Sequence, residues 1–171
     1  MNDLEKLKAK GYKLQTDWQN LKNNSIFILG TKNNKNFIFY QNNAFEKGCR
    51  FIICNHKFKN KFLKKEIKYF YYKKKEDLYV ISKIFIDPIK SKIIFITGTN
   101  GKTSLAFGVH QLMRLNKIKS SYIGTLGFYV NSKKIKSLKN TTPEYIEILN
   151  LISFSQKNKC KYVFIEASSI G

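Results

Sequence analysis

The feature that most constrains the fold is an apolar run that leads into a glycine-rich turn, "KIIFITGTNGKTS" at residues 92–104. The run at 92–97 is typical of a buried strand, and the segment from about Lys102 to Asn116 is predicted to be a helix. Gly98 and Gly101 stand where the chain must turn sharply between the two. A strand, a glycine turn and a helix in this order predict an α/β domain built on a parallel sheet.

The same turn has the composition of a phosphate-binding loop. Gly98 and Gly101 allow backbone N–H groups to approach phosphate oxygens, and the following helix directs its positive end at the same place. Lys102 can reach the β- and γ-phosphates of a nucleotide, and the Thr103 hydroxyl can bind Mg²⁺. The pattern is the short G-x-x-G-K-T, because the first glycine of the long form would fall at Ile96. A purely structural turn is the alternative, but the strand, glycines, lysine and threonine together favour a nucleoside triphosphate site.

The rest of the chain alternates between predicted strands and helices. In the first half, strands are predicted at 25–29, 36–40, 50–55 and 67–72, and helices at 42–49 and 75–85. In the second half, strands are predicted at 119–124 and 161–167, a hairpin at 127–138, and a helix at 142–158. Thr142 is the predicted N-cap of that last helix, with Pro143 in its first position. The predicted fold class is α/β: a small N-terminal α/β domain, residues 1–88, and then the first part of a mostly parallel-sheet P-loop ATPase domain, residues 89–171.

The net charge of +21 raises the question of nucleic-acid binding. Only Arg50 and Arg114 are arginines, although arginine is the residue that best reads bases and binds phosphate through two hydrogen bonds. Lys, Asn, Ile, Phe and Tyr are all abundant and all have A/T-rich codons, so compositional bias explains the charge better than a nucleic-acid surface. A basic nucleic-acid-binding protein remains an alternative, and it predicts affinity that falls steeply with salt.

Cysteine usage and hydropathy indicate the compartment. Cys49, Cys54 and Cys160 are odd in number and lack the spacing of a metal site, which is typical of reduced thiols in a cytosolic protein. The N-terminus "MNDLEKLKAK" has no apolar signal region, and no apolar run approaches the ~18 residues of a membrane span. We therefore expect a cytoplasmic protein without a membrane partner.

Four segments together resemble a known family. The turn "TGTNGKTS" (97–104) is similar to the ATP loop of the Mur ligases, which add amino acids to the peptidoglycan precursor. The segments "IGTLG" (123–127), "NTTPE" (140–144) and "FIEASS" (164–169) resemble segments of the MurE type, in the same order. Upstream, "AFEKGCRFIIC" (44–54) and "IDP" (86–88) resemble the end of the family's uridine-binding domain. Folylpolyglutamate synthetases share the loop but usually have glycine where this chain has Thr103.

The resemblance implies roles for particular residues. It implies that Lys102 is catalytic and that ATP is bound by Gly98, Thr99, Asn100, Gly101, Lys102, Thr103 and Ser104. It implies contacts to the UDP-muramoyl dipeptide from Asn140, Thr141, Thr142 and Ser168, and Mg²⁺ binding by Thr103 and Glu166. From the residues alone, two alternatives stay open: Thr142 as a simple helix cap and Ser168 as the start of a loop.

The reaction that the resemblance implies is amide formation in two stages. ATP phosphorylates the terminal carboxylate of UDP-N-acetylmuramoyl-L-alanyl-D-glutamate, and the amine of a diamino acid then displaces phosphate. Meso-diaminopimelate is preferred over L-lysine from family frequency alone. The implied cofactors are ATP and Mg²⁺, and a monomer is expected.

The sequence also departs from the family pattern. The family's Asp-Ser-Arg, which helps to seat the uridine nucleotide, is here Asp17, Trp18 and Gln19, and Trp18 could stack on a base or simply pack. Ile170 stands in place of a histidine, and the chain ends at Gly171, before the family's carbamylated lysine and C-terminal domain. We therefore expect the N-terminal portion of a MurE-type ligase, inactive alone. A non-catalytic nucleotide-binding remnant and a folylpolyglutamate synthetase-like ligase also stay open as interpretations of the sequence.

Overall fold

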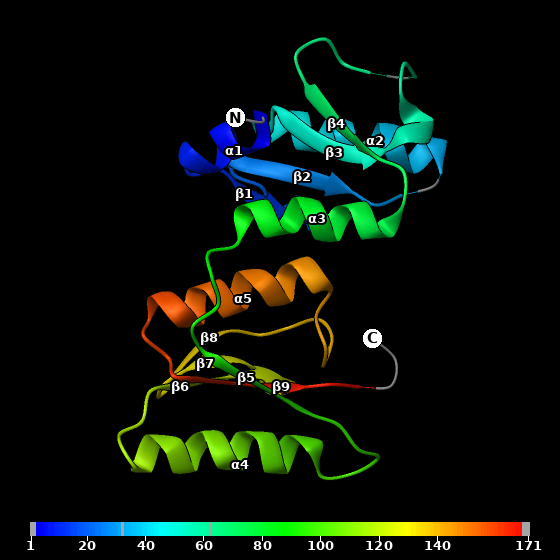
Figure 1. Ribbon diagram of the computed structural model, residues 1–171. Coiled ribbons are helices and arrows are strands. Elements are labelled where there is room, and N and C mark those ends of the chain that lie inside the picture. The colour runs from blue at the N-terminus through cyan, green and yellow to red at the C-terminus, as the bar shows by residue number, and fades with distance from the viewer. Residues whose placement is uncertain (1–2, 32, 62, 169–171) are drawn as a thin grey trace. The chain divides into compact units, whose positions relative to one another are not determined.

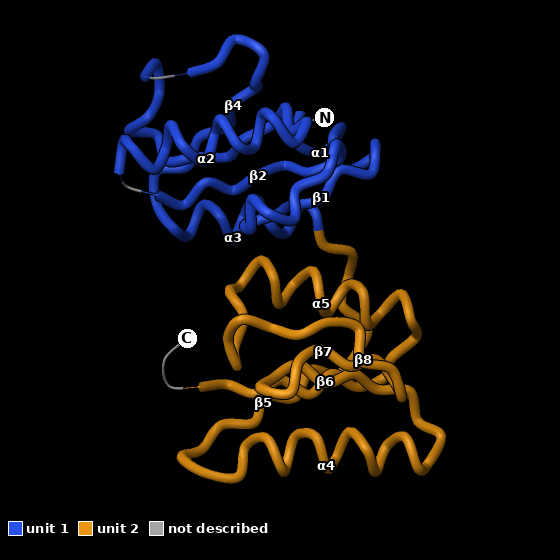
Figure 2. The backbone as a smooth tube through the Cα atoms, turned by 180° about the vertical axis from the view of Figure 1, so that it is seen from behind, with its two compact units in different colours: residues 1–85 blue, residues 86–171 orange. Residues whose placement is uncertain are grey.

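The computed structural model describes residues 3–31, 33–61 and 63–168 (Figure 1). The chain divides into two compact units, residues 1–85 and 86–171 (Figure 2). Each unit contains a sheet with parallel strands and helices packed against it, so the predicted α/β fold class is confirmed. The division falls between Phe85 and Ile86, three residues before the predicted domain boundary between residues 88 and 89.

The first unit is a four-stranded parallel sheet with the strand order β1-β2-β3-β4. Its strands are β1 (Lys13–Gln15), β2 (Ser25–Leu29), β3 (Phe51–Asn55) and β4 (Lys68–Tyr72). Its α-helices are α1 (Asp3–Ala9), α2 (Asn34–Glu46) and α3 (Lys75–Phe85), and 3₁₀ turns occupy Trp18–Asn20 and His56–Phe58. Figures 1 and 2 show α2 and α3 on opposite sides of this sheet. The core under α2 joins Phe37 and Ala44 to Phe27, Ile52 and other buried strand residues.

The strand predicted at 36–40 is wrong, because these residues lie in the first turns of α2. The Asn33 side chain starts the helix by accepting hydrogen bonds from Lys35 N at 2.8 Å and Asn36 N at 3.4 Å. Burial follows helical rather than alternating spacing, since Phe37 is fully buried while Phe39, two residues on, is 53% exposed. Residues 42–46 of the helix predicted at 42–49 form the C-terminal end of α2, and residues 47–49 lie beyond the helix.

The second unit carries a five-stranded mixed sheet with the order β5-β9-β6-β7-β8. Its strands are β5 (Lys92–Ile96), β6 (Ser120–Gly124), β7 (Gly127–Val130), β8 (Lys133–Lys136) and β9 (Tyr162–Glu166), and its helices are α4 (Lys102–Leu115) and α5 (Tyr145–Lys157). The first three strands in this order are parallel, whereas β7 pairs antiparallel with β6 and β8 pairs antiparallel with β7. Figure 1 shows α4 and α5 on opposite faces of the sheet. The core on the α5 side consists of Ile123, Phe128, Val130, Leu151, Ile152, Cys160, Val163 and Ile165.

This strand order determines where a site can form. Strand β9 is last in the chain but lies between β5 and β6, so the carboxyl ends of three parallel strands meet at one edge. In open α/β sheets, ligands bind outside the carboxyl ends of the strands. The glycine turn follows β5, and the segments after β6 and β9 lie beside it.

Two further expectations concern the whole chain. Cys49, Cys54 and Cys160 are all buried and form no disulfide, and burial raises the pKa of the Cys54 thiol to about 12. Among the described residues, no helix has both the length and the apolar character needed to cross a bilayer.

Candidate functional site: a cavity at the glycine turn

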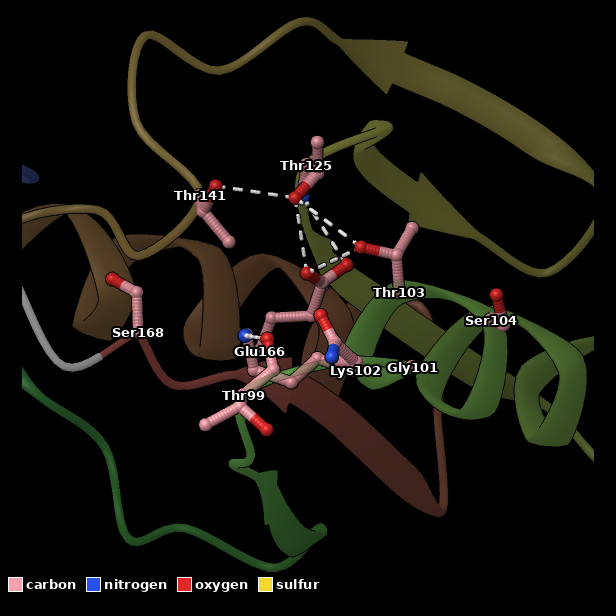
Figure 3. Close-up of a pocket in the computed structure, with 10 residues that line it drawn as sticks. Thr99, Gly101, Lys102, Thr103, Ser104, Thr125, Thr141, Glu166 and Ser168 are labelled. Atoms are coloured by element: carbon pink, nitrogen blue, oxygen red, sulfur yellow. Dashed lines mark hydrogen bonds between the residues drawn. The ribbon is translucent and has the colours of Figure 1, made fainter.

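A cavity of about 330 Å³ opens at the carboxyl edge of the second sheet (Figure 3). It is lined by Thr99, Asn100, Gly101, Lys102, Thr103, Ser104, Thr125, Thr141, Glu166 and Ser168. These residues come from four segments that are distant in the sequence: the glycine turn, the turn after β6, the segment before α5, and the end of β9. The structure thus brings most of the predicted site residues around one space.

The glycine turn has a backbone that requires glycine at its last position. Gly101 is the N-cap of α4 with φ 75°, in the left-handed region, and its carbonyl accepts a hydrogen bond from Leu105 N at 2.9 Å. A Cβ at Gly101 would meet no atom within 4 Å, so the constraint there is conformational rather than steric. The positive end of α4, a helix of 14 residues, consequently faces the cavity and favours an anionic group.

Lys102 is folded back onto the turn that precedes it. Its ammonium group donates to Gly98 O at 2.5 Å and to Thr99 O at 3.2 Å. These bonds hold a positive charge at the mouth of the cavity and close the turn. A bound phosphate would compete with the two carbonyls for the same ammonium, because all three are hydrogen-bond acceptors.

Glu166 is the most constrained side chain of the site, because its carboxylate is fully buried at the end of β9. Its Oε2 accepts from the hydroxyls of Thr103 at 2.8 Å and Thr125 at 3.0 Å. Its Oε1 accepts from Thr125 N at 3.2 Å and from the Tyr122 hydroxyl. Burial is the main cause that raises the pKa of the Tyr122 phenol, so this hydroxyl stays protonated and donates at neutral pH.

No cation neutralises this carboxylate among the residues that the structure describes, since none of their ion pairs involves Glu166. The donors to it that come from this part of the chain are neutral hydroxyls and a backbone N–H. A buried carboxylate is costly even when hydrogen-bonded, and a cation beside it would offset that cost. The site therefore favours a positively charged ligand next to Glu166.

The donor set fits Mg²⁺ held jointly with a nucleotide. The described residues contain no group of three or more His, Cys, Asp or Glu that could hold a metal on their own. Glu166 and the Thr103 hydroxyl supply hard oxygen atoms at the cavity wall. Proteins usually bind Mg²⁺ through one or two carboxylates together with substrate phosphates and water, which is the kind of site these residues can make.

Thr142 does not cap α5, so the predicted helix start is wrong. The helix begins at Tyr145, and its N-cap is Glu144, which makes no side-chain cap hydrogen bond. The Thr142 hydroxyl instead donates to Glu166 O at 2.9 Å and accepts from Ser168 N at 2.8 Å. Its Oγ also lies 3.0 Å from that of Ser168. The pair Thr142 and Ser168 ties the segment before α5 to the end of β9.

The other predicted residues differ in how closely they approach the cavity. Thr141 lines it and its hydroxyl lies 3.1 Å from that of Thr125. Asn140 is exposed and is not among the lining residues. Ser104 lines the cavity from the first turn of α4, and Figure 3 shows it farther from Glu166 than Thr103. Ile170, the noted departure from the family pattern, lies outside the described residues.

Sequence reasoning missed three residues of this site: Tyr122, Gly124 and Thr125. The segment "IGTLG" signalled that the turn matters, but it gave no role to Thr125, whose backbone and side chain both bind Glu166. Gly124 makes room, because a Cβ there would lie 2.3 Å from Glu166 Oε1 and 2.6 Å from the Tyr122 hydroxyl. No local signal marks Tyr122, since its partner is 44 residues away in the sequence.

In the first unit, the segment that departs from the family pattern is engaged in local structure. Asp17 caps the 3₁₀ turn by accepting from Gln19 N at 3.0 Å. Trp18 is half-buried against the core under α2, with its ring 6.0 Å from Phe39 and 5.7 Å from the Lys47 ammonium. Trp18 therefore packs, which is one of the two expected roles.

Comparison with known proteins identifies the family. Residues 96–171 match the Mur ligase middle domain, the part of the chain that contains the glycine turn and Glu166. The chain belongs to the Mur ligase family. It is 30% identical to UDP-N-acetylmuramoyl-L-alanyl-D-glutamate–2,6-diaminopimelate ligase of Clostridium tetani, over 91% of this chain and 33% of the relative. The Helicobacter pylori enzyme of the same name is 42% identical over 47% of this chain and 18% of its own length.

Relatives with another amino-acid substrate and two solved structures are also similar. A Staphylococcus aureus UDP-N-acetylmuramoyl-L-alanyl-D-glutamate–L-lysine ligase is 40% identical over 44% of this chain and 15% of its own length. A solved 2,6-diaminopimelate ligase has a TM-score of 0.62 at 19% identity, covering 92% of this chain and 32% of that one. MurF ligase from Thermotoga maritima, in complex with ADP, has a TM-score of 0.59 at 14% identity, covering 99% of this chain and 34% of that one. The two structures support the shared fold, and this Mur ligase chain spans a third or less of the length of its curated relatives.

Proposed function

We propose that this chain forms the nucleotide-binding part of a ligase of peptidoglycan precursor synthesis. The proposed reaction adds a diamino acid, meso-diaminopimelate, to UDP-N-acetylmuramoyl-L-alanyl-D-glutamate in the cytoplasm and uses ATP and Mg²⁺. The observation that carries the proposal is the cavity where Lys102, the N-terminus of α4 and the buried Glu166 face one space. A carboxylate that can bind a cation, beside a helix N-terminus that favours an anion, suits a Mg²⁺–nucleotide complex.

In this proposal each of the two predicted domains has its own task. Residues 89–171 hold ATP, with Gly98 to Ser104 as the phosphate loop and Lys102 as the catalytic cation. Residues 1–88 bind the uridine end of the substrate. Asn140, Thr141, Thr142 and Ser168 contact its muramoyl-dipeptide part. Thr141 and Ser168 line the same cavity as the glycine turn, and the Thr142 hydroxyl lies 3.0 Å from that of Ser168, which supports the assignment of these three residues.

The chemistry needs charge control rather than a protein nucleophile. An oxygen of the dipeptide carboxylate attacks the γ-phosphorus of ATP, the bond from that phosphorus to the β–γ bridging oxygen breaks, and ADP leaves. The neutral amine of the diamino acid then attacks the acyl carbon, phosphate leaves, and the nitrogen loses a proton. Lys102 and the N–H groups of the turn stabilise negative charge on the transferring phosphoryl group. Mg²⁺, when bound by Glu166 and Thr103, would supply further neutralisation of that charge.

The alternatives make different predictions. The names of the relatives favour a ligase of peptidoglycan synthesis over a folylpolyglutamate synthetase. A non-catalytic remnant would bind nucleotide without transferring phosphate, and a nucleic-acid-binding protein would not require the glycine turn at all.

Calorimetric titration of the purified chain with ATP, with and without Mg²⁺, tests the proposal. We expect Mg²⁺-dependent binding that weakens at least about tenfold in Lys102→Ala, because a charge-assisted hydrogen bond is worth roughly 1.5–3 kcal/mol. Lys133→Ala is the matched control, since it removes the same charge from exposed strand β8. Equal ATP affinity in the wild type and Lys102→Ala would refute the phosphate-loop assignment. Stronger binding to DNA than to ATP, lost as salt is raised, would favour the nucleic-acid alternative.

A further inference from the structure

We propose that Tyr122 is a positioning residue that fixes the Glu166 carboxylate so that one chosen oxygen faces the cavity and its cation. This inference rests on the proposed function, because it concerns the same Mg²⁺–nucleotide site. Tyr122 lies outside the lining of the cavity and acts only through Glu166. Its hydroxyl donates to Glu166 Oε1 and accepts a hydrogen bond from Leu126 N at 3.3 Å.

The tyrosine ring is held in place by its surroundings. Tyr122 is fully buried in the second unit. Its ring makes an edge contact with Phe107 of α4 at 5.1 Å and another with Tyr129 of β7 at 6.0 Å. The His110 ring lies 6.4 Å away in a stacked orientation. A side chain packed on both α4 and β7 has little freedom to change rotamer, so its hydroxyl is a fixed donor.

The two oxygens of Glu166 are bound by different kinds of donor. Oε1 is bound by the packed Tyr122 hydroxyl and by Thr125 N, neither of which can turn away without moving the backbone or the packed ring. Oε2 is bound by the Thr103 and Thr125 hydroxyls, whose hydrogens rotate freely about the C–O bond. A cation can replace the interactions at Oε2 with small rotations, whereas Oε1 stays bound. Tyr122 thereby determines which oxygen is presented to the cavity.

Strand β6 also supplies the space that this arrangement needs. Gly124 lies two residues after Tyr122, on the same face of the strand. A Cβ at Gly124 would lie 2.3 Å from Glu166 Oε1 and 2.6 Å from the Tyr122 hydroxyl. The absence of a side chain at this position lets the phenol and the carboxylate meet. The segment 122–125 thus contributes a donor, a space and a second donor to one carboxylate.

A purely structural role for Tyr122 makes a different prediction. If the ring only fills the core, Tyr122→Phe alters stability and leaves the Mg²⁺ dependence of nucleotide binding unchanged. If the hydroxyl positions Glu166, the variant raises the Mg²⁺ concentration needed for half-maximal ATP binding. Loss of a residue that orients a metal ligand typically weakens metal affinity by 10–100-fold, so we expect a shift of about tenfold.

The experiment measures ATP binding across a Mg²⁺ titration for the wild type, Tyr122→Phe and the control Tyr129→Phe. Tyr129 belongs to the same aromatic group but does not contact Glu166, so its variant should behave as the wild type. ATP binding without Mg²⁺ should be the same in all three, and thermal unfolding without ligand checks that each is folded. In a Glu166→Gln background, Tyr122→Phe should cause no further shift, because its effect passes through that carboxylate.

The outcomes separate this inference from the proposed function. If the wild type shows Mg²⁺-dependent ATP binding and Tyr122→Phe needs the same Mg²⁺ concentration, the positioning role is overturned and the proposed function stands. The same shift in Tyr129→Phe, or a full shift that persists in the Glu166→Gln background, also overturns it. A wild type with no Mg²⁺-dependent ATP binding overturns the proposed function, and the inference with it.

Discussion

Replacing Gly124 by alanine should destabilise the second unit and disturb its cavity at the same time. The new methyl group would lie 2.3 Å from Glu166 Oε1, 2.6 Å from Glu166 Cδ and 2.6 Å from the Tyr122 hydroxyl. Atoms cannot approach so closely, and the surrounding strands β6 and β9 are paired to each other, so the carboxylate must move. Forcing extra volume into a packed core costs about 1–3 kcal/mol, and a buried donor left without its acceptor costs about 1–3 kcal/mol more. We expect a loss of about 2–6 kcal/mol in the free energy of unfolding.

The two units offer separate signals for this measurement. Trp18 is the one tryptophan of the sequence and lies in the first unit, so its fluorescence reports unfolding there. Circular dichroism reports both units. In urea, Gly124→Ala should therefore move the unfolding transition of the second unit, seen by circular dichroism, to a lower urea concentration. The transition seen by Trp18 fluorescence, which reports the first unit, should stay where it is in the wild type. Mg²⁺-dependent ATP binding should weaken in parallel, because Glu166 is displaced.

Gly108→Ala is the matched control. Gly108 lies inside α4, and a Cβ there would meet no atom within 4 Å. Alanine is better than glycine in a helix interior, so this variant should stabilise the same unit by about 0.5–1 kcal/mol. If Gly124→Ala unfolds at the wild-type urea concentration or above, the close approach of Gly124, Glu166 and Tyr122 is refuted.

Three further predictions test other parts of the structure. Asn33→Ala should lower the free energy of unfolding of the first unit by about 1 kcal/mol, because it removes the side-chain cap of α2. The Trp18 fluorescence transition should then occur at a lower urea concentration, and an unchanged transition would contradict that cap. Gly101→Ala should lower the free energy of unfolding by about 1 kcal/mol, since φ 75° strains any residue with a Cβ. It should also weaken ATP binding measured by calorimetry, and full ATP affinity would show that the turn can relax. Burial lowers the pKa of His110 below its ordinary value of 6.5, so the unfolded chain binds more protons than the folded one as pH falls past that value. The free energy of unfolding should therefore fall from pH 7 toward pH 5 in the wild type and in the surface variant His56→Gln. In His110→Gln, the part of this pH dependence that comes from His110 should vanish.

Segments governed by local chemistry could be predicted from the sequence. The helix predicted at 75–85 has the bounds of α3, and the strand predicted at 25–29 has those of β2. The glycine turn was predictable because its glycines, lysine and following helix are adjacent in the chain. In each case the residues that determine the structure lie within one element or one turn.

Segments governed by distant partners could not be predicted in this way. The aromatic run at 36–40 reads as a strand, but the Asn33 cap and the burial of Phe37 beneath the helix override that preference. Thr142 and Pro143 read as a helix start, but the Thr142 hydroxyl is taken by Glu166 O and Ser168, more than twenty residues away. These partners meet only once the register of β9 beside β6 is set.

The glycine turn is only one half of the candidate site, and the sequence motif does not reveal the residues that form the other half. The glycine turn supplies positive charge from Lys102 and the end of α4, and this charge attracts a phosphate. Glu166 supplies the opposite charge, and it can remain buried only because Thr103, Thr125 and Tyr122 all donate to it. Thr103 belongs to the turn and also binds Glu166, so the two halves of the site share one hydroxyl. A ligand that carries both phosphate and a divalent cation satisfies both halves at once, whereas phosphate or the cation alone would satisfy only one of them.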